Sequence, residues 1–404
     1  MGLLSERSRY AVNPLEEDDA IAEAMERKGK KIIRLNRGDP AVYFPTPKYI
    51  KEAYIEAIAE NKTYYTETRG AKELVAAVMG RYRRMYGLDL EEEDIVITSG
   101  VSEALYMLSS ALLDRDDRVI VFKPYYTQYI PYIGLAGGRE YLLDYKENDG
   151  WGIDIDELNR HVRKLKHKAR IKYMLLTNPN NPTGTVLGRK TLEGIVDLAN
   201  EHDLLLVSDE IYDEIVFNGA RFTSIAQMAR GIPYVILNGA SKDFDATGFR
   251  IGFAIVPGRD KLSKELKAKL ADFASVRISA NAPAQYAVAE GMNNVVEHNR
   301  AIRYMVSEIE ERTNFAVKLL DENKELTTVR PRGAYYIFPK IDLKRIGFKD
   351  DKEFVDSLLK SECVQITRGS GFGTPGHIRI VSLPPKEILE EAITRLNEFC
   401  RRKR

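Results

Sequence analysis

The stretch of sequence that decides the fold runs from Tyr173 to Tyr212 and reads YMLLTNPNNPTGTVLGRKTLEGIVDLANEHDLLLVSDEIY. It holds an apolar run at 173–176, a helix-like segment at 190–201 and a second apolar run at 204–207. Both runs are nearly continuously apolar, which is typical of strands that are buried on both faces of a sheet. Strands that alternate with helices in this way predict an α/β fold with a mainly parallel sheet.

The same alternation continues on both sides of this stretch. Further apolar runs predict strands at 95–98, 118–122, 234–237 and 252–256, and another helix-like segment lies at 102–113. Beyond about residue 290 the pattern changes. Helical segments at 295–323, 351–360 and 385–402 are mixed with strand-like runs at 334–338, 364–366 and 377–381. Strands and helices without strict alternation predict a separate, smaller α+β domain.

Length and composition restrict the class of protein. A chain of 404 residues predicts two domains. The 61 Lys and Arg residues against 60 Asp and Glu leave a net charge of +1, which argues against nucleic acid or an anionic membrane as partner. The two cysteines are too few for a disulfide framework, and the five histidines do not pair at metal-ligand spacing, so we expect no metal site.

Two further patterns bear on where the protein works. Residues 1–19 lack the apolar core of a secretory signal. No apolar run approaches the roughly 18 residues that are needed to cross a bilayer. We therefore expect a cytoplasmic protein without a membrane span.

Polar, aromatic and glycine-rich segments follow the predicted strands. These segments lie at 99–102, 124–126, 178–184, 209–212 and 239–242. Ligands of open α/β sheets bind outside the carboxyl ends of the strands. We therefore expect the segments to converge on one site.

Each of these segments has an ordinary explanation beside a functional one. The free N–H groups of a helix that opens at 99–102 favour an anion such as phosphate, or mark a plain N-cap. Asp209 ends an apolar run, so its carboxylate needs a partner such as a pyridinium N–H, unless it caps a following helix. Lys242 is a nucleophile if a desolvated pocket removes its proton, and otherwise a surface lysine. Arg250 clamps a phosphate or forms a surface salt bridge.

Taken together, the motifs resemble the aspartate/alanine aminotransferase family of fold-type I pyridoxal-phosphate (PLP) enzymes. The most specific are NPNNPTG at 178–184, SDEIY at 208–212 and GASKDFDATGFRIG at 239–252, in the order and spacing of the family. The resemblance extends from Leu35 to the last helix and is closest to the alanine-type branch, judging by Gly38-Asp39-Pro40 and by segments 332–339 and 369–373.

The resemblance implies the domain organisation of fold-type I PLP transferases. Residues 46–290 would form a large PLP-binding domain, with a mainly parallel seven-stranded sheet flanked by helices. Residues 291–404 would form a small C-terminal α+β domain. Residues 1–45 would be an N-terminal arm that also contributes to the small domain.

The resemblance also implies which residues hold the ring of the cofactor. Lys242 would bind PLP as a Schiff base and act as general base and acid in the proton transfer. Asp209 would pair with the pyridine nitrogen and keep the ring protonated. Asn181 and Tyr212 would hydrogen-bond the 3-oxygen of PLP, and Tyr126 would stack on its ring.

A second group would hold the phosphate. Arg250 would bind it together with the backbone of Val101 and Ser102, and Tyr65 would reach the phosphate of the neighbouring subunit in a homodimer. One departure from the family stands here. Many relatives carry a phosphate-binding serine three residues before the lysine, where this chain has Gly239. Either Ser241 partly substitutes, or the phosphate has one contact fewer.

A third group would bind the substrate. Arg379 would bind the α-carboxylate through both guanidinium nitrogens, beside Asn181 and the Gly38 backbone. A distal carboxylate, as in 2-oxoglutarate, needs another cation. Arg37 and Arg277 are candidates, although either could equally form an ordinary salt bridge.

The implied reaction is transfer of an amino group between amino acids and 2-oxo acids by a ping-pong route. Alanine with 2-oxoglutarate is the leading pair, and aspartate or a broad set that includes aromatic substrates is the alternative. Another PLP reaction, such as a C–S β-lyase or a cyclopropane-forming synthase, would share the cofactor residues. A PLP-binding transcriptional regulator would need a DNA-binding extension, for which residues 1–30 are too short. A non-enzymatic scaffold would have little reason to place these residues at the strand ends.

Overall fold

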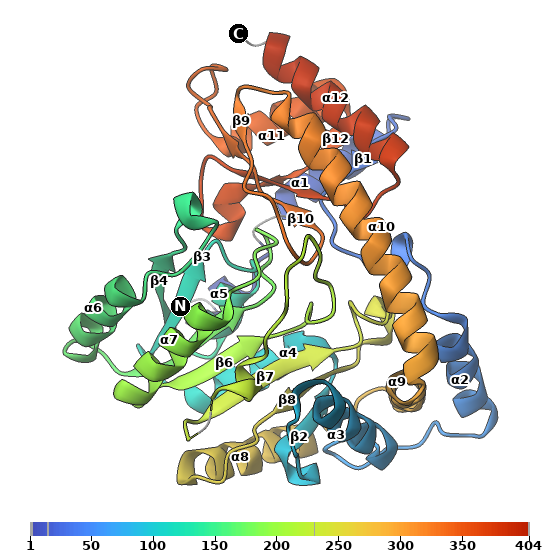
Figure 1. Ribbon diagram of the computed structural model, residues 1–404, viewed down its shortest axis with the longest axis vertical. Helices are drawn as coiled ribbons and strands as arrows, with labels where there is room; N and C mark the ends of the chain where they lie inside the picture. Colours follow the sequence, from blue (N-terminus) through green and yellow to red (C-terminus); the bar gives the residue numbers. More distant parts are fainter. Residues whose placement is uncertain (1–2, 14–15, 230, 403–404) are drawn as a thin grey trace.

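A computed structural model of the protein describes residues 3–13, 16–229 and 231–402 (Figure 1). Residues 1–2 of the predicted arm and residues 403–404 of the predicted C-terminal domain lie outside the described residues. A seven-stranded sheet forms its centre, in the order β2-β8-β7-β6-β5-β3-β4. β8 alone runs in the direction opposite to the other six strands of this sheet. The predicted α/β fold with a mainly parallel seven-stranded sheet is confirmed. The strands are β2 (Ile95–Thr98), β3 (Arg118–Lys123), β4 (Arg139–Asp144), β5 (Ile171–Thr177), β6 (Leu205–Asp209), β7 (Tyr234–Gly239) and β8 (Gly252–Ile255).

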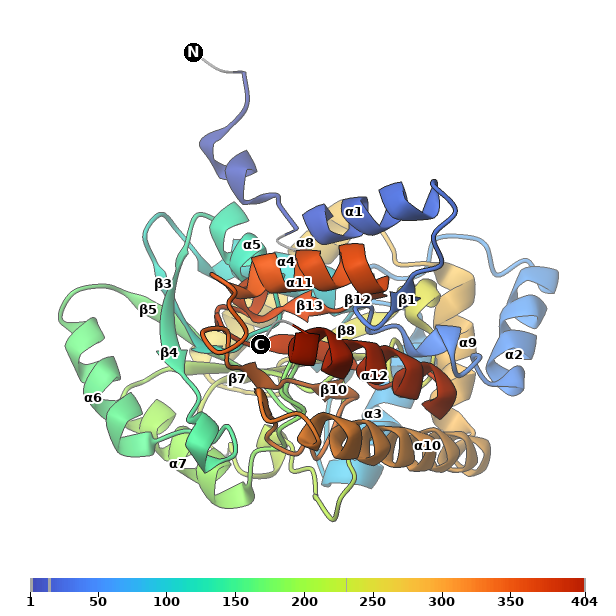
Figure 2. The same ribbon diagram turned by 90° about the horizontal axis from the view of Figure 1, so that it is seen from above.

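Helices cover both faces of this sheet (Figure 2). In β5, Tyr173 and Leu175 pack toward α4, α5 and α8, whereas Met174 and Leu176 pack toward α3, α6, α7 and α9. Because alternate residues are buried on opposite faces, no position of a central strand is left for a polar side chain, and the runs read as continuously apolar. The helices are α3 (Lys72–Tyr86), α4 (Gly100–Leu112), α5 (Tyr129–Leu135), α6 (Ile155–Lys166), α7 (Arg189–Glu201), α8 (Lys261–Arg277) and α9 (Ala282–Asn293).

The edge strand β4 has no apolar run of this kind. It pairs with β3 alone, and Leu143 is its only buried residue. A strand at the edge is covered on fewer sides, so polar residues are tolerated along it. The sequence of β4 therefore lacks the continuously apolar run by which the other strands of the sheet are predicted.

The C-terminal elements gather at one end of the molecule, above the sheet in Figure 1. A second hydrophobic cluster joins Ile33 and Leu35 to residues between Ala316 and Cys400. The N-terminal arm thus packs against C-terminal residues, as a contribution of the arm to the small domain requires. The domain boundaries at residues 45 and 290 stay a prediction. The elements are β1 (Ile33–Arg34), β9 (Leu326–Thr327), β10 (Tyr336–Ile337), β11 (Lys340–Ile341), β12 (Val364–Gln365), β13 (Thr367–Arg368), β14 (Ile378–Val381), α10 (Val295–Asp321), α11 (Asp351–Glu362) and α12 (Lys386–Arg402). Two further helices, α1 (Glu16–Glu26) and α2 (Lys48–Ala59), precede the sheet.

The ends of β5, β6 and β7 lie side by side at one edge of the sheet, since Thr177 pairs with Asp209 and Asp209 with Leu237. The antiparallel β8 starts at this edge, where Gly252 lies opposite Gly239. Arg250 precedes its strand and still reaches the same edge, because β8 runs in the opposite direction. Within the described ranges, no helix has the length and apolar character that crossing a membrane requires.

Candidate active site

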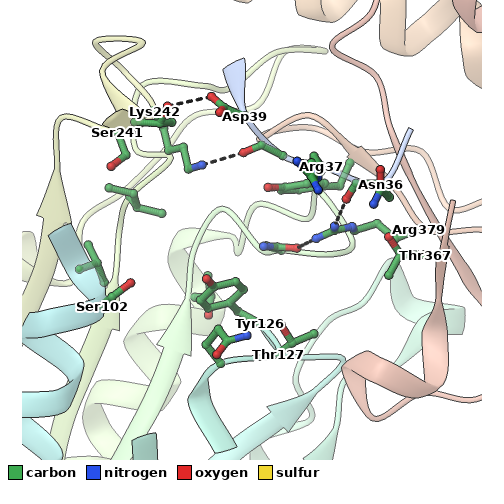
Figure 3. A pocket seen from close by; sticks show the side chains of 18 of the residues that line it. Asn36, Arg37, Asp39, Ser102, Tyr126, Thr127, Ser241, Lys242, Thr367 and Arg379 are labelled. Atoms are coloured by element: carbon green, nitrogen blue, oxygen red, sulfur yellow. Dashed lines mark hydrogen bonds between the residues drawn. The ribbon is translucent and has the colours of Figure 1, made fainter. Parts of the chain in front are cut away.

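A cavity of about 400 Å³ opens at this edge of the sheet. Figure 3 shows Lys242 and Ser241 reaching it from one side and Arg379 and Thr367 from the other. The fold brings together residues as distant in sequence as Gly38 and Arg379. Of the two arginines considered for a distal carboxylate, Arg37 lines the cavity and Arg277 does not, and of the other predicted residues all except Tyr65 line it. The predicted residues that line it are Gly38, Val101, Ser102, Tyr126, Asn181, Asp209, Tyr212, Ser241, Lys242, Arg250 and Arg379.

The amine of Lys242 faces the cavity and donates a hydrogen bond to the carbonyl of Gly38 at 2.8 Å. Burial lowers the pKa of this amine to about 8, with Asp39 opposing the effect and Arg250 and Arg379 adding to it. A lysine with such a pKa is neutral in a useful fraction near neutral pH, and the neutral amine is the nucleophilic form. Because Lys242 lines the cavity and its amine is held by the Gly38 carbonyl, it is not an ordinary surface lysine.

Asp209 presents a buried carboxylate at the end of β6. Its Oδ2 accepts a hydrogen bond from the Tyr129 hydroxyl at 2.7 Å, and its Oδ1 accepts one from the Ile211 N–H at 3.3 Å. Burial raises the pKa of Asp209 to about 6. No helix follows, because residues 211–214 form turns, so the helix-cap alternative is wrong. In the part of the chain that the structure describes, Asp209 forms no ion pair, which leaves it able to accept a charged N–H from a ligand.

Tyr129 is a site contact that the sequence analysis missed. It lies three residues after Tyr126 and the two rings meet edge to face, with centroids 5.4 Å apart. Its hydroxyl also contacts the Thr177 Oγ1 at 2.7 Å, so it bridges the ends of β5 and β6. Tyr126 lies before α5 and Tyr129 is its first residue, so no helical spacing marked the two as a pair in the sequence.

The guanidinium of Arg379 is held entirely by neutral groups. It donates to the Asn181 Oδ1 at 3.0 Å and to the Asn36 carbonyl at 2.6 Å, while its buried Nε has no partner among the described residues. Its plane lies against the rings of Tyr336 and Phe372, at 4.8 and 4.7 Å. Burial lowers its pKa, because desolvation disfavours the charged form. A buried cation held in this way is suited to bind a carboxylate.

Three tyrosines form a connected group between the Lys242 side of the cavity and its Arg379 side. The hydroxyls of Tyr212 and Tyr336 are 2.8 Å apart, and the ring of Tyr335 meets both of theirs. The Tyr335 hydroxyl donates to the Gly38 carbonyl at 3.1 Å. Tyr212 is therefore oriented by contacts that come from the C-terminal part of the chain.

The start of α4 forms a cradle suited to an anion. Ser99 is its N-cap but its side chain makes no capping hydrogen bond, and the first N–H groups of a helix have no acceptor within the helix. Arg250 lies beside it, with its Nη2 3.4 Å from the Ser99 carbonyl. A Cβ at Gly100, which has φ +76°, would come within 2.5 Å of this Nη2. The absence of that side chain lets the Arg250 guanidinium lie close to the first turn of α4, so that its charge and the free N–H groups of this turn are together suited to an anion.

Close packing of two strands explains why a glycine stands at position 239. A Cβ there would lie 2.6 Å from the Ile251 carbonyl oxygen and 2.7 Å from the Gly252 Cα, both backbone atoms. The packing of β7 against β8 therefore excludes the serine that many relatives carry. Ser241 lines the cavity two residues later.

Three predicted residues differ in their relation to the cavity. Tyr65 is 76% exposed and does not line the cavity of its own chain. Arg277 pairs with Glu103 at 3.3 Å and does not line it either. Arg37 does line it, and its only ion pair in the described ranges is with Asp19, at 3.5 Å.

The remaining lining residues were not singled out as site residues from the sequence. Asp39 accepts hydrogen bonds from the Thr247 hydroxyl at 2.8 Å and from the Ala41 N–H at 3.1 Å, close to Lys242. The others are mostly polar side chains spread over α1, strand ends, a turn and irregular segments, so no single sequence pattern distinguishes them. They include Asn13, Asp18, Asp19, Asn36, Thr127, Gln128, Thr177, Ile366 and Thr367.

Comparison with known proteins agrees with this geometry. The family model described as aminotransferase class I and II matches residues 30–396. The glutamate-pyruvate aminotransferase AlaA of Haemophilus influenzae is 36% identical over 380 residues, which cover 93% of this chain and 92% of that protein. An aspartate aminotransferase of Bacillus subtilis is 32% identical over 94% of both chains. The structure of an alanine aminotransferase from Pyrococcus furiosus superposes with a TM-score of 0.92 at 35% identity, covering 99% of this chain and 100% of that one.

Proposed function

The chain belongs to the class I and II aminotransferases, which use PLP, and on that premise we propose that it transfers the amino group between alanine and 2-oxoglutarate. The observation that carries the reaction class is Arg379, a buried guanidinium held by neutral groups at the cavity that Lys242 faces. The names of the Haemophilus and Pyrococcus relatives support alanine as the amino acid. The name of the Bacillus relative supports aspartate as the alternative.

The residues of the cavity fit PLP. The cradle at Gly100 beside Arg250 suits its phosphate, and the buried carboxylate of Asp209 suits its ring nitrogen. When bound, PLP supplies a conjugated, protonated ring that withdraws electrons from the substrate's Cα–H bond. Val101 and Ser102 would offer their backbone N–H groups to the phosphate, with Ser241 nearby.

Each remaining residue has a separate task in our proposal. Arg379 holds the substrate carboxylate and so fixes the Cα at the cavity. The Oδ1 of Asn181 accepts from Arg379, which leaves its amide nitrogen free to donate to the cofactor's 3-oxygen, together with the Tyr212 hydroxyl. Tyr126 covers the ring face. The amine of Lys242 acts first as a general base, which accepts the proton from the substrate Cα. It then acts as a general acid, which donates the proton again to complete the transfer of the amino group.

Arg37 is our candidate for the distal carboxylate of 2-oxoglutarate. It lines the cavity beside Gly38, and its Nη2 is 3.5 Å from the Asp19 carboxylate. Asp19 is also satisfied by the amides of Asn36 and Gln365, both at 2.9 Å. Arg37 can therefore turn toward a ligand without leaving Asp19 unpaired.

The first test is the amino-acid half-reaction of purified, PLP-loaded protein. We expect alanine to convert the visible absorbance band of the bound cofactor and to release one pyruvate for each site, and 2-oxoglutarate to restore the band. If aspartate or tyrosine converts the band and alanine does not, the reaction class stands and the proposed substrate is wrong. With an S-substituted cysteine in place of alanine, release of the thiol together with pyruvate and ammonia, in place of a stored amino group, would indicate a C–S β-lyase.

We propose a homodimer in which Tyr65 completes the phosphate site of the partner subunit. The exposed Tyr65 lies just after α2, whose Ile55 and Ile58 are also exposed, and a face of this kind is typical of a protein interface.

The cytoplasmic location inferred from the sequence likewise stays a prediction.

Subunit mixing tests this arrangement. Tyr65→Ala is expected to raise the Kd for PLP at least about tenfold, because it removes one hydrogen bond to a charged group. Mixed with Lys242→Ala subunits, it should regain tight PLP binding and activity in hybrid dimers, where one site has both residues intact. The matched control is Tyr64→Phe. It removes a neighbouring hydroxyl that contacts the Tyr286 hydroxyl at 3.3 Å. Mixing that restores nothing would contradict a shared site.

A further inference from the structure

A single buried guanidinium lies behind the cavity. Arg81, on α3, is 4% exposed. Its Nη2 donates to both carboxylate oxygens of Asp213 and to the Oδ2 of Asp243, all at 3.1 Å. Its Nη1 donates to the Oε2 of Glu214 at 2.5 Å. One cation thus gathers three carboxylates that come from two different segments.

These segments are the ones that carry two of the proposed cofactor residues. Asp213 and Glu214 directly follow Tyr212, and Asp243 directly follows Lys242. Neither segment is held by a long helix at this point, since residues 211–214 and 240–244 form turns. Arg81 therefore joins the two turns behind the cavity, alongside a direct contact between the carboxyl groups of Asp213 and Asp243.

Further contacts fasten this cluster to two helices. The Tyr86 hydroxyl on α3 donates to the Asp213 carboxylate. The Nε2 of His298, on α10, is 2.7 Å from the Glu214 Oε2. The ring of Phe244 stacks on His298, with centroids 4.4 Å apart and planes 25° apart. The two turns are thereby placed relative to α3 and α10 as well as to each other.

The charges of the cluster depend on Arg81. Burial and the Asp213 carboxylate raise the pKa of Asp243 well above its ordinary value. Burial also acts to raise the pKa of Glu214, but Arg81 and His298 outweigh it and keep that carboxyl ionised. Without a cation at this point, the buried carboxylates would repel one another or take up protons. Either response displaces the turns that they belong to.

We propose that Arg81 is a positioning residue, which sets the separation between the Tyr212 hydroxyl and the Lys242 amine by holding Asp213 and Asp243 together. This inference rests on the roles proposed above for Tyr212 and Lys242. Arg81 does not line the cavity, so it acts through its neighbours and not by touching a ligand.

The test compares Arg81→Met with Lys267→Met. Lys267, on α8, is also a buried cation, 3% exposed, that pairs with Asp94 at 2.7 Å and with Glu93 at 3.1 Å. It does not line the cavity, so its replacement removes a buried ion pair without affecting the site. Thermal unfolding of both variants is measured first, and we expect both to be less stable than the wild type.

The discriminating readout is the pH at which the visible absorbance band of the PLP-loaded protein changes. In Arg81→Met this midpoint should move to higher pH. Loss of a nearby cation favours the protonated form of the group that gives the band, so a higher pH is needed to deprotonate it. We expect kcat/KM to fall at least about tenfold, a loss of transition-state stabilisation that Lys267→Met should not share. A midpoint and a kcat/KM equal to those of Lys267→Met would show that Arg81 has only a structural role.

Arg81→Lys keeps the test decisive if Arg81→Met does not fold. A lysine retains the charge but lacks the planar fork that donates to several carboxylates at once. We expect near-normal stability with a lowered kcat/KM, and unchanged kinetics would overturn the proposal. If the wild-type protein itself shows no band that depends on Lys242, the proposed function fails. A normal wild-type band with unaltered Arg81 variants contradicts only the positioning role.

Discussion

Lys242→Ala is expected to abolish amino transfer and to remove the visible absorbance band of the PLP-loaded protein. In the proposed mechanism, the variant loses both the amine that attaches the cofactor and the group that moves the proton at the substrate Cα. General acid–base catalysis alone contributes about 10²–10⁴-fold. We therefore expect kcat to fall by at least about 10⁴-fold, measured as pyruvate formed from alanine with 2-oxoglutarate.

The pKa of Lys242 adds a pH dependence to this prediction. Burial lowers that pKa to about 8, and only the neutral amine attacks a carbonyl. The rate at which the wild-type apoprotein takes up PLP covalently should therefore rise with pH through about 8 and then level off. Lys264→Ala, which replaces an exposed lysine of α8, is the control and should leave spectrum, rate and activity unchanged. A band that persists in Lys242→Ala would refute the central assignment.

Asp209→Asn is expected to have opposite effects on activity and on the stability of the apoprotein. Asparagine keeps the shape and can still accept from the Tyr129 hydroxyl, but it carries no charge to hold a protonated ring nitrogen. We expect kcat/KM to fall about 10³-fold, the scale on which preorganised electrostatic groups contribute to catalysis.

The stability effect follows from the raised pKa of Asp209. Burial raises it from the ordinary value of 3.8 to about 6, so the folded chain holds the proton more tightly than the unfolded chain does. Below about pH 4 both states are protonated and the carboxyl costs nothing. As the pH rises toward 6 the unfolded state loses its proton first, and the cost of burying the charge grows to about 3 kcal/mol. Asparagine avoids this cost.

Thermal unfolding of the apoproteins at pH 4 and pH 8 measures the difference. Asp209→Asn should match the wild type at pH 4 and be more stable than it at pH 8, whereas Asp197→Asn, on the exposed face of α7, should match it at both. An Asp209→Asn apoprotein that is less stable at pH 8 would mean that the carboxylate already has a cationic partner in the folded chain. The stabilisation should disappear once PLP is bound to the wild type.

Several features of the site depend on contacts that no local pattern reveals. Arg250 precedes its strand, and it reaches the site only because β8 runs antiparallel to β7. A side chain at position 239 is disfavoured because a Cβ there would meet the backbone of the neighbouring strand. Tyr129 reaches Asp209 across 80 positions of sequence. Strand direction, packing distance and side-chain reach are properties of the folded chain, so a sequence pattern cannot give them.

What the sequence by itself determined is the class of fold and the residues at the strand ends. Burial on both faces forces continuously apolar strands, and turns after strands need polar and glycine residues, so both signals are local. Only the tertiary structure decided how Asn36, Asn181 and Arg379 meet, and which two turns Arg81 joins. The physical reason is that a buried charge must be satisfied by whichever groups the packing brings near, and these come from distant parts of the chain.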